Sequence, residues 1–334
     1  MIKLKLLVFE YSCIVFEENL VLEGFDILKS ILNDLDKTSI FDVTYLVTPA
    51  IVDLNLENCS RIEIEDDLCL WLDRHCIEYD YCLFVAPEDN QIQYNLTKIL
   101  EKHNITLLNS GSHASFISSS KNMTYEKVPD SILKIPSQLI KLEDTKKVIE
   151  EHDFNKNKLV IKPDDKTSSE LIFILEKRSN IDKIIREYKK NDVKHVLIQD
   201  YVDGIDISVS LVVNDDNITF LSINRQNIVK NSGRLIFNGC KTRIENPLED
   251  EIVKISEKII RSIEGLKGFI GMDYIISNSK IYFVEINARL TTSFITLSES
   301  CNKNLTEEII RYVLYDNPMN LEFKESLTYL KGGI

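Results

Sequence analysis

Two carboxylates and one amide lie close together in the stretch GFIGMDYIISNSKIYFVEINARLTTSF, which runs from Gly268 to Phe294. Asp273 lies on the first of two strand-like runs. Glu285 and Asn287 lie on the second run, two positions apart and therefore on one face. Turn-forming residues between the two runs favour an antiparallel hairpin. If Asp273 pairs with Glu285, all three side chains share a face, and such a set of oxygen atoms suits a hard divalent cation.

The pairing of Asp273 with Glu285 leaves Asn278, Ser279 and Lys280 as a three-residue loop. The opposite face then carries side chains that can pack on a core, namely Met272, Tyr274, Ile276, Tyr282, Val284 and Ile286. The pattern fits equally well an exposed strand face that is acidic and binds nothing. Placement of Asp273 and Glu285 on opposite faces would rule out the metal site.

Two lysines are candidates for phosphate contacts. Lys162 ends the apolar run LVIK and precedes Pro163, which favours an extended backbone at Lys162 and so directs its ammonium group. A lysine held in this way can serve as a point charge for a nucleotide phosphate, and Lys121 is a second candidate. Each also fits an ordinary exposed lysine.

The run QDYVDGID, from Gln199 to Asp206, has the character of an extended hinge. Its main-chain groups can read a base and the Asp206 carboxylate can hold a ribose diol, although a plain turn between strands also fits. Arg225 and Arg289 add cations in the half of the chain that carries the hairpin, and Arg289 follows Asn287 by two positions. Cations beside an acidic, metal-type face suit phosphoryl transfer, because catalysis there depends on charge neutralisation and positioning.

The elements that must position these residues begin with an α/β region over residues 1–118. Strand-like runs are expected at Leu4–Glu10, Phe41–Thr48, Arg61–Ile64, Tyr81–Ala86 and Ile105–Asn109, and helices at Val21–Leu35, Leu68–Cys76 and Gln91–His103. This alternation indicates a mostly parallel sheet. The glycine fingerprint of dinucleotide-binding folds is absent, which argues against NAD. Glu10 and Glu88 follow strand ends, where a helix cap or an exposed loop is the favoured interpretation.

A small, polar segment around residues 110–120 indicates a domain boundary. Beyond it we expect a lid near residues 119–195 and a larger unit that carries the hairpin, without one continuous sheet through all three parts. Expected strands are Lys158–Pro163, Glu170–Leu175, Thr219–Asn224 and a pair formed by His195–Asp200 with Ile207–Val213. Expected helices are Ile181–Lys190, Glu249–Ile263 and Leu305–Tyr315.

Composition narrows the class of protein. The chain has 334 residues, enough for two or three domains, and 40 basic against 53 acidic side chains give a formal charge of −13, which argues against a general nucleic-acid binder. No apolar run reaches the roughly 20 residues that span a bilayer. The seven cysteines form no CxxC pair, so we expect reduced thiols in a cytoplasmic protein, and the scattered histidines do not indicate zinc. A homo-oligomer stays open.

Taken in order, these segments resemble the ATP-grasp ligases. The resemblance rests on Lys121, VIKP at 160–163, QDYVDGID at 199–206, Asp273 and the Glu285-x-Asn287 pair, and it covers about residues 119–318. Within this superfamily, VFEYS, VAPED, LSINRQNI, GLKGFIGMDY and EINARLTTSF are similar to archaeal ligases that join tyramine to L-glutamate in methanofuran biosynthesis. The resemblance implies a Rossmann-like preATP-grasp α/β domain at 1–118. A two-lobed α+β ATP-grasp domain would follow at 119–318, with its catalytic lobe from about 196, and residues 319–334 would form a C-terminal tail.

The resemblance also implies roles for individual residues. Lys121 and Lys162 would contact the phosphates of ATP, Asp206 would hold the ribose, and the adenine would be lined by Gln199, Asp200, Tyr201 and Val202. The three hairpin residues Asp273, Glu285 and Asn287 would bind one or two Mg²⁺ or Mn²⁺ ions. A carboxylate substrate would attack the γ-phosphate to give an acylphosphate and ADP, and an amine would displace the phosphate to form an amide. Arg289 and Arg225 would stabilise charge on the acylphosphate.

The chain departs from the family pattern after Pro163. Members usually carry a glycine-rich loop over the phosphates, whereas residues 164–170 read DDKTSSE, and no glycine occurs between Gly111 and Gly204. Asp164 and Asp165 would also bring negative charge toward a triphosphate, which is unfavourable unless they point away. Two functions therefore stay open. The favoured one is an ATP-dependent carboxylate–amine ligase, and the other is a non-catalytic paralogue that binds nucleotide or regulates.

Overall fold

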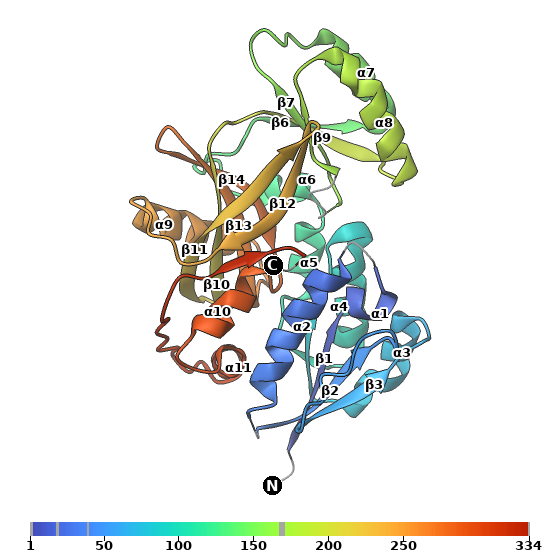
Figure 1. The fold of residues 1–334 in the computed structure, drawn as a ribbon, viewed down its shortest axis with the longest axis vertical. Helices are drawn as coiled ribbons and strands as arrows, with labels where there is room; N and C mark the ends of the chain where they lie inside the picture. Colours follow the sequence, from blue (N-terminus) through green and yellow to red (C-terminus); the bar gives the residue numbers. More distant parts are fainter. Residues whose placement is uncertain (1–2, 18–19, 39, 167–170, 333–334) are drawn as a thin grey trace.

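The protein has three parts arranged along its long axis (Figure 1). The structure is a computed structural model and describes residues 3–17, 20–38, 40–166 and 171–332. The N-terminal domain lies at the bottom in blue, a lid in green at the top, and the lobe that carries the hairpin in between. Among these residues no helix is long and apolar enough to cross a membrane.

The N-terminal domain is the expected α/β layer. Its five parallel strands have the order β3-β2-β1-β4-β5 and comprise β1 (Leu4–Glu10), β2 (Phe41–Val47), β3 (Cys59–Glu63), β4 (Tyr81–Val85) and β5 (Thr106–Leu107). Alternate residues of β1 enter two cores, because successive side chains of a strand point to opposite faces. Leu6 and Val8 pack with helix α2 (Val21–Leu35). Leu7 and Phe9 pack with α3 (Leu68–His75) and α4 (Ile92–Lys102).

The lid and the lobe share a second sheet of ten strands. Nine of them form the path β14-β13-β10-β11-β12-β8-β7-β9-β6, and β15 pairs with β12 beside it. The lid strands are β6 (Ser137–Lys141), β7 (Leu159–Pro163), β8 (Phe173–Leu175) and β9 (His195–Asp200). The lobe strands are β10 (Ile205–Asn214), β11 (Asn217–Asn231), β12 (Arg234–Lys241), β13 (Gly268–Ser277) and β14 (Lys280–Asn287). The two halves meet where Arg234 of β12 lies opposite Phe173 of β8. Among the described residues the N-terminal sheet is separate, so no sheet there runs through all three parts.

The predicted pairing of His195–Asp200 with Ile207–Val213 is wrong. Strand β9 pairs with β6 and β7 inside the lid, and β10 pairs with β11 and β13 inside the lobe. The connection at residues 201–204 contains no hairpin turn, and it carries the chain from one half of the sheet to the other. It is therefore a hinge between lid and lobe, the alternative that the extended character of QDYVDGID had left open.

The helices cover these sheets in separate layers. Helices α7 (Thr145–Glu151) and α8 (Ile181–Lys190) pack in the lid, α9 (Glu249–Ile260) packs on the lobe, and α1 (Ser12–Val15) precedes α2. Helices α5 (Ser112–Ser118) and α6 (Lys121–Lys127) lie against β14 of the lobe. Helices α10 (Ser293–Ser300) and α11 (Leu305–Tyr315) contact α2 of the N-terminal domain. The tail also contains a strand, β15 (Thr328–Leu330), that pairs with β12.

Candidate functional site

The hairpin of β13 and β14 brings the two predicted carboxylates together, because Asp273 lies opposite Glu285. The loop differs from the prediction. Ser277 pairs with Lys280, so the turn contains only Asn278 and Ser279, both with positive φ. The register shifts between Asp273 and Tyr274, where Val284 has no partner. This β-bulge takes up the residue that the shorter turn releases, and the pairing of the carboxylates is kept.

The bulge also changes which side chains face the core. Tyr282 and Val284 were predicted on the core face, but Ile281 and Phe283 take these positions and are almost fully buried. Val284 lines the opposite side, together with the carboxylates. A bulge inverts the alternation on one strand beyond the point where it occurs, which explains the error. Met272, Tyr274 and Ile286 are buried in the core as predicted.

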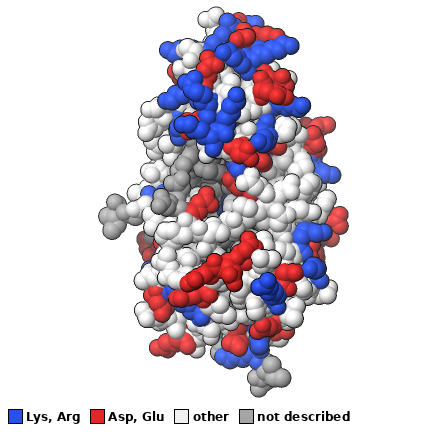
Figure 2. Space-filling model, turned by 90° about the vertical axis from the view of Figure 1, so that its right-hand side faces the viewer, with Lys and Arg blue, Asp and Glu red and all other residues white. Residues whose placement is uncertain are grey.

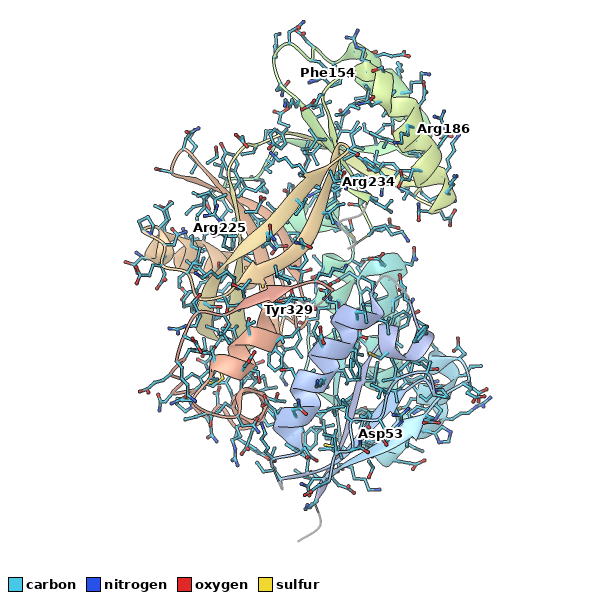
Figure 3. All side chains as sticks on the ribbon, viewed as in Figure 1. Asp53, Phe154, Arg186, Arg225, Arg234 and Tyr329 are labelled. Atoms are coloured by element: carbon cyan, nitrogen blue, oxygen red, sulfur yellow. The ribbon has the colours of Figure 1, made fainter. Side chains whose placement is uncertain are left out.

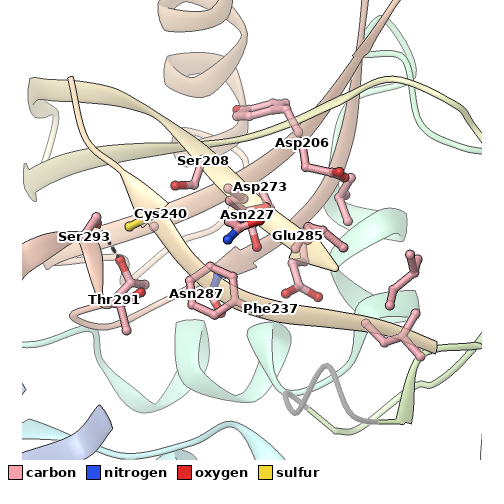
Figure 4. A pocket seen from close by; sticks show the side chains of 18 of the residues that line it. Asp206, Ser208, Asn227, Phe237, Cys240, Asp273, Glu285, Asn287, Thr291 and Ser293 are labelled. Atoms are coloured by element: carbon pink, nitrogen blue, oxygen red, sulfur yellow. Dashed lines mark hydrogen bonds between the residues drawn. The ribbon is translucent and has the colours of Figure 1, made fainter. Parts of the chain in front are cut away.

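A cavity of about 540 Å³ lies between the three parts of the protein, and the hairpin forms one of its walls. Figure 4 shows Asp273, Glu285 and Asn287 side by side in this wall, with Asp206, Ser208 and Phe237 around them. In Figure 2 a hollow lies below the lid, with acidic side chains in and around it and basic side chains gathered above it. The charged groups predicted from the sequence, except Lys121, therefore line one cavity.

The carboxylates of Asp273 and Glu285 repel each other when both are ionised. Burial, together with the negative charge of Glu285, raises the pKa of Asp273 well above its usual range. Burial also opposes ionisation of Glu285, but the nearby cations Lys121 and Lys162 hold the pKa of this group below its ordinary value. The Gln226 Nε2 donates to Asp273 Oδ1 at 2.9 Å. A cation placed between them would oppose the rise in the pKa of Asp273.

The side chains of Asp273, Glu285 and Asn287 are ligands of the kind that a magnesium-type ion prefers. Two carboxylates and the Asn287 amide offer only oxygen ligands, which hard cations prefer. Within the described residues no group of three or more His, Cys, Asp or Glu side chains could hold a metal ion. A cation on this face would take its other ligands from a substrate or from water, as is usual for Mg²⁺.

Both candidate lysines are buried, so the interpretation as exposed side chains is wrong for each. Lys162 lines the cavity, and burial lowers its pKa to about 8 although the charge of Glu285 opposes the shift. Lys121 does not line the cavity. Its Nζ lies 3.6 Å from Glu285 Oε2 and donates to the carbonyl of Lys166 at 2.5 Å. Lys121 therefore contacts Glu285 from outside the cavity, beside the segment that contains Lys166.

The residues expected around a nucleoside all line the cavity, namely Gln199, Asp200, Tyr201, Val202 and Asp206. The Gln199 side chain is buried and donates to the Tyr125 hydroxyl at 3.1 Å. Burial raises the pKa of Asp206, although the charges of Lys230 and Arg225 oppose the shift.

Sequence reasoning missed the apolar side chains that line the same space, which include Ile135, Val160, Ile172, Leu235 and Phe237. Strand alternation could have identified Val160, because it shares a face with Lys162. The others come from lid and lobe strands whose contribution to one cavity depends on how these parts meet.

Arg289 is held by a buried carboxylate from another domain. Its Nε lies 3.0 and 3.2 Å from the two carboxylate oxygens of Glu88, and its Nη1 donates to the carbonyl of Leu290 at 3.2 Å. Glu88 is only 2% exposed, so its interpretation as an exposed loop charge is wrong. It lies at the N-cap position of the short 3-10 helix Asp89–Gln91, but its side chain makes no capping hydrogen bond there. Burial raises the pKa of Glu88 and the Arg289 charge opposes that shift. The ion pair fixes the guanidinium at the wall of the cavity.

The second arginine and the second strand-end carboxylate also line the cavity. Arg225 is exposed and lies near Asp206, the electrostatic partner noted above. Glu10 is buried and accepts hydrogen bonds from Ser12 Oγ at 2.6 Å and from Cys13 N at 2.9 Å. Glu10 therefore satisfies donors at the start of α1, in agreement with the capping interpretation.

The glycine-free segment turns one of its acidic side chains away from the cavity. Asp164 accepts from Ser120 Oγ at 2.7 Å and from the Asn122 backbone at 2.8 Å, at the start of α6. Neither Asp164 nor Asp165 lines the cavity. Lys166 reaches the N-terminal domain, where its Nζ lies 2.8 Å from Asn90 Oδ1. Residues 167–170 of this segment lie outside the described residues.

Comparison with known proteins agrees with this geometry. Residues 118–293 match the model of the ATP-grasp domain, and residues 45–114 match that of the pre ATP-grasp 3 domain. The chain is 32% identical to a tyramine–L-glutamate ligase of Methanocaldococcus fervens over 98% of this chain and 97% of the relative. It is 33% identical to that of Methanocaldococcus jannaschii, over 96% and 91%. A crystal structure of an ATP-grasp superfamily protein from Archaeoglobus fulgidus superposes with a TM-score of 0.70 at 24% identity, covering 92% of this chain and 88% of the other.

Proposed function

Because this chain belongs to the ATP-grasp ligases, which form C–N bonds, we propose that it joins L-glutamate to tyramine and yields γ-glutamyltyramine. The observation that supports ligase chemistry in this chain is the convergence of Lys162, the carboxylate pair and Arg289 on one cavity. The similarity to tyramine–L-glutamate ligases over nearly the whole chain supports the choice of substrates. The place in methanofuran biosynthesis stays a prediction from the sequence.

ATP is needed because a free carboxylate is a poor acyl donor. Its leaving group would be an oxide, whereas transfer of the γ-phosphoryl group makes the leaving group a phosphate. In the proposed reaction the carboxylate oxygen bonds to the γ-phosphorus, and the bond from that phosphorus to the ADP oxygen breaks. The amine nitrogen then bonds to the acyl carbon, loses a proton, and phosphate leaves. The two steps together give amide, ADP and phosphate.

The lid and hinge residues would bind the nucleotide. Main-chain groups of residues 199–202 that are not used in strand pairing would read the adenine edge against the apolar wall, and Asp206 would accept hydrogen bonds from the ribose. Lys162 would donate to the phosphates from the lid sheet, with Lys121 beside the carboxylate face. Charge neutralisation of this kind supplies most of the catalysis of phosphoryl transfer.

Asp273, Glu285 and Asn287 would hold a divalent cation, which we take to be Mg²⁺ or Mn²⁺. Such an ion neutralises charge on the phosphates and orients them. The role of the chain itself is to keep the carboxylates paired by the bulge in β14 and to keep Gln226 bonded to Asp273. Arg289, fixed by Glu88, would stabilise the acylphosphate. Arg225 lies near Asp206 and would add charge near the ribose, a different role from the acylphosphate contact expected from the sequence.

The non-catalytic alternative was motivated by the glycine-free segment. The orientation of Asp164 weakens that argument, because its carboxylate accepts hydrogen bonds at the start of α6 and does not line the cavity. We therefore favour turnover over nucleotide binding alone.

The test is incubation of the purified protein with Mg-ATP, tyramine and L-glutamate. We expect ADP release that depends on both substrates, and a product whose mass equals their sum minus one water. Hydroxylamine in place of tyramine should trap the acylphosphate as a hydroxamate. ADP release with other amine–carboxylate pairs only would overturn the substrates and keep the ligase class. Tight ATP binding without turnover over a broad panel would favour the non-catalytic paralogue.

A further inference from the structure

The residue after the C-terminal strand β15 reaches the cavity. Lys331 follows this strand and lines the cavity, and so does Glu23 of helix α2. Lys331 Nζ lies 3.5 Å from Glu23 Oε2. Both side chains are partly exposed, to 27% and 23%, so the pair is accessible from the cavity. An ion pair from two distant parts of the chain thus lies in the wall of the cavity.

Strand β15, which precedes Lys331, is fixed on both sides. Tyr329 lies between the lobe and α2 (Figure 3), and its hydroxyl donates to Asp26 Oδ2 at 2.9 Å. On the other side, β15 pairs with β12 at Gly239 and Cys240. Gly239 has φ of +122°, and a Cβ there would lie 2.0 Å from the Tyr329 carbonyl oxygen. Only glycine permits this close approach, so the position of the tail is specified by the sequence of β12.

The Glu23–Lys331 pair shares the cavity with other polar side chains. Cys240, Thr292 and Ser293 line the cavity as well, and so do Arg289 and Asn287 on the carboxylate side. A small molecule can therefore have one end at Arg289 and the other at the Glu23–Lys331 pair.

We propose that Glu23 and Lys331 bind the zwitterionic head of the donor amino acid, Glu23 its α-ammonium group and Lys331 its α-carboxylate, so that its side-chain carboxylate faces Arg289. This inference rests on the proposed function and deepens it. In the free protein the two side chains neutralise each other, and an α-amino acid offers one cation and one anion to replace that contact. An amine acceptor offers a cation alone and would leave Lys331 unmatched.

Donors that lack one head group test the assignment of each side chain. 4-Aminobutyrate keeps the reacting carboxylate and the ammonium of L-glutamate but has no α-carboxylate, and glutarate lacks the ammonium. We expect Lys331→Met to raise the KM for L-glutamate about 10- to 100-fold, the loss of one hydrogen bond to a charged group. The same variant should leave the KM for 4-aminobutyrate within about twofold. Glu23→Gln should show the reverse selectivity, with glutarate unaffected.

Controls separate binding from closure of the cavity. Lys331→Arg keeps the cation and should retain most of the affinity for L-glutamate. Lys324→Met removes an exposed lysine of the same tail that does not line the cavity and should change nothing. In every variant the KM for ATP should stay at the wild-type value. A rise in KM for 4-aminobutyrate equal to that for L-glutamate would overturn the proposal, because it would show a merely structural role.

Failure of the proposed function has a different outcome. If the wild-type protein does not use L-glutamate, a panel of α-amino acids and simple carboxylates identifies its donor by ADP release, and the same variants are compared on that donor. A donor without an α-amino-acid head overturns the proposal even though the ligase class stands. If no donor turns over, calorimetry with L-glutamate in the presence of Mg-ADP decides, and no binding, or binding that Lys331→Met leaves unchanged, overturns it. Binding lost in that variant and kept in Lys324→Met supports it.

Discussion

At the scale of single residues, the carboxylate face is a place where charge is concentrated before any ligand arrives. Asp273 and Glu285 lie opposite each other on paired strands, and burial together with the charge of Glu285 raises the pKa of Asp273 well above its usual range. The cations Lys121 and Lys162 hold the pKa of Glu285 below its ordinary value although burial opposes this. A divalent ion bound between the carboxylates would favour the ionised form of Asp273, so we expect binding of such an ion to be linked to release of a proton.

The first prediction concerns Glu285→Gln, which keeps the size of the side chain and removes one charge. Because a bound Mg²⁺ has few protein ligands, we expect turnover and magnesium-dependent ATP affinity to fall by at least about tenfold. Stability should fall by about 1–3 kcal/mol, because the buried Lys121 and Lys162 lose a carboxylate partner, although repulsion with Asp273 is removed as well. Nucleotide titrations with and without Mg²⁺, beside a melting curve, provide the measurement. Wild-type magnesium dependence in this variant would show that the hairpin is not the metal site.

The second prediction concerns protonation of Lys162. Burial lowers its pKa from 10.5 to about 8 in the free protein, and the negative charge of a bound triphosphate should raise it again. We therefore expect proton uptake when nucleotide binds between about pH 8 and 9, and weaker nucleotide affinity as the pH rises above about 8. Calorimetry in buffers of different ionisation enthalpy measures the uptake.

The variant Lys162→Arg is the control, because an arginine stays charged throughout this range and should bind nucleotide without proton uptake. The effect on folding has a definite sign. The unfolded chain binds more protons at Lys162 between pH 8 and 10.5, so the contribution of this group to stability rises with pH over that window and is lost as the pH falls through about 8. Equal proton uptake by the wild type and the arginine variant would contradict this account.

At the scale of elements, the hairpin shows what could be predicted from the sequence. The period of two and the turn residues identified β13 and β14 and the face that Asp273, Glu285 and Asn287 share. The bulge at Val284 could not be predicted, because a two-residue turn with a bulge and a three-residue loop without one place the carboxylates identically. Only the packing of Ile281 and Phe283 in the core distinguishes them.

The pairing of β9 with β6 and β7 could not be predicted from the sequence for another reason. Local pattern identifies a strand, but its partners are set by contacts that are distant in sequence, such as Ser137 opposite Gln199. The same limit applies to the tail. Residues 328–330 form only a short strand, and their order depends on one glycine of β12 and one hydroxyl contact to α2.

The third prediction tests that order. Gly239→Ala should detach β15, because the added Cβ would lie 2.0 Å from a backbone oxygen that cannot move within the pairing. We expect a loss of about 1–3 kcal/mol in stability and faster amide hydrogen exchange at residues 328–330. The KM for the donor amino acid should rise while the KM for ATP stays unchanged. Gly332→Ala is the matched control, since φ is +92° there but nothing lies within 4 Å of the added carbon. Equal exchange at residues 328–330 in both variants would contradict the role of the close approach.

At the scale of the whole molecule, the cavity exists only where three parts meet. We propose the division expected from the sequence, with an N-terminal domain over residues 1–118, an ATP-grasp domain over 119–318 and a tail over 319–334. The sheet that lid and lobe share has one narrow junction, at Arg234 and Phe173, which suits relative motion of the two halves. The N-terminal domain is instead fixed to the lobe by buried polar contacts and by the core that α2 shares with α10 and α11.

Two of these buried contacts involve carboxylates of the N-terminal domain, Glu88 and Asp34, which lie at different places. Glu88 accepts from Arg289 beside the cavity. Asp34 accepts from Ser298 Oγ at 2.9 Å and from Thr306 N and Oγ1 at 3.1 and 2.8 Å, and it does not line the cavity. Each carboxylate belongs to the N-terminal domain and is less than 10% exposed. Together they allow docking of the domain to be separated from positioning of the arginine.

The fourth prediction uses this pair. Both Glu88→Gln and Asp34→Asn should cost about 1–3 kcal/mol in stability, since each leaves a buried polar partner poorly satisfied. Below the melting temperature, only Glu88→Gln should lower kcat, by about tenfold or more, because Arg289 loses the ion pair that fixes its guanidinium at the cavity. The KM for ATP should stay near the wild-type value in both variants, since neither side chain lies at the nucleotide end. Melting curves beside steady-state kinetics make the measurement. If Asp34→Asn lowers kcat as much as Glu88→Gln does, the loss comes from weakened docking of the domain, and Glu88 has no separate role in positioning Arg289.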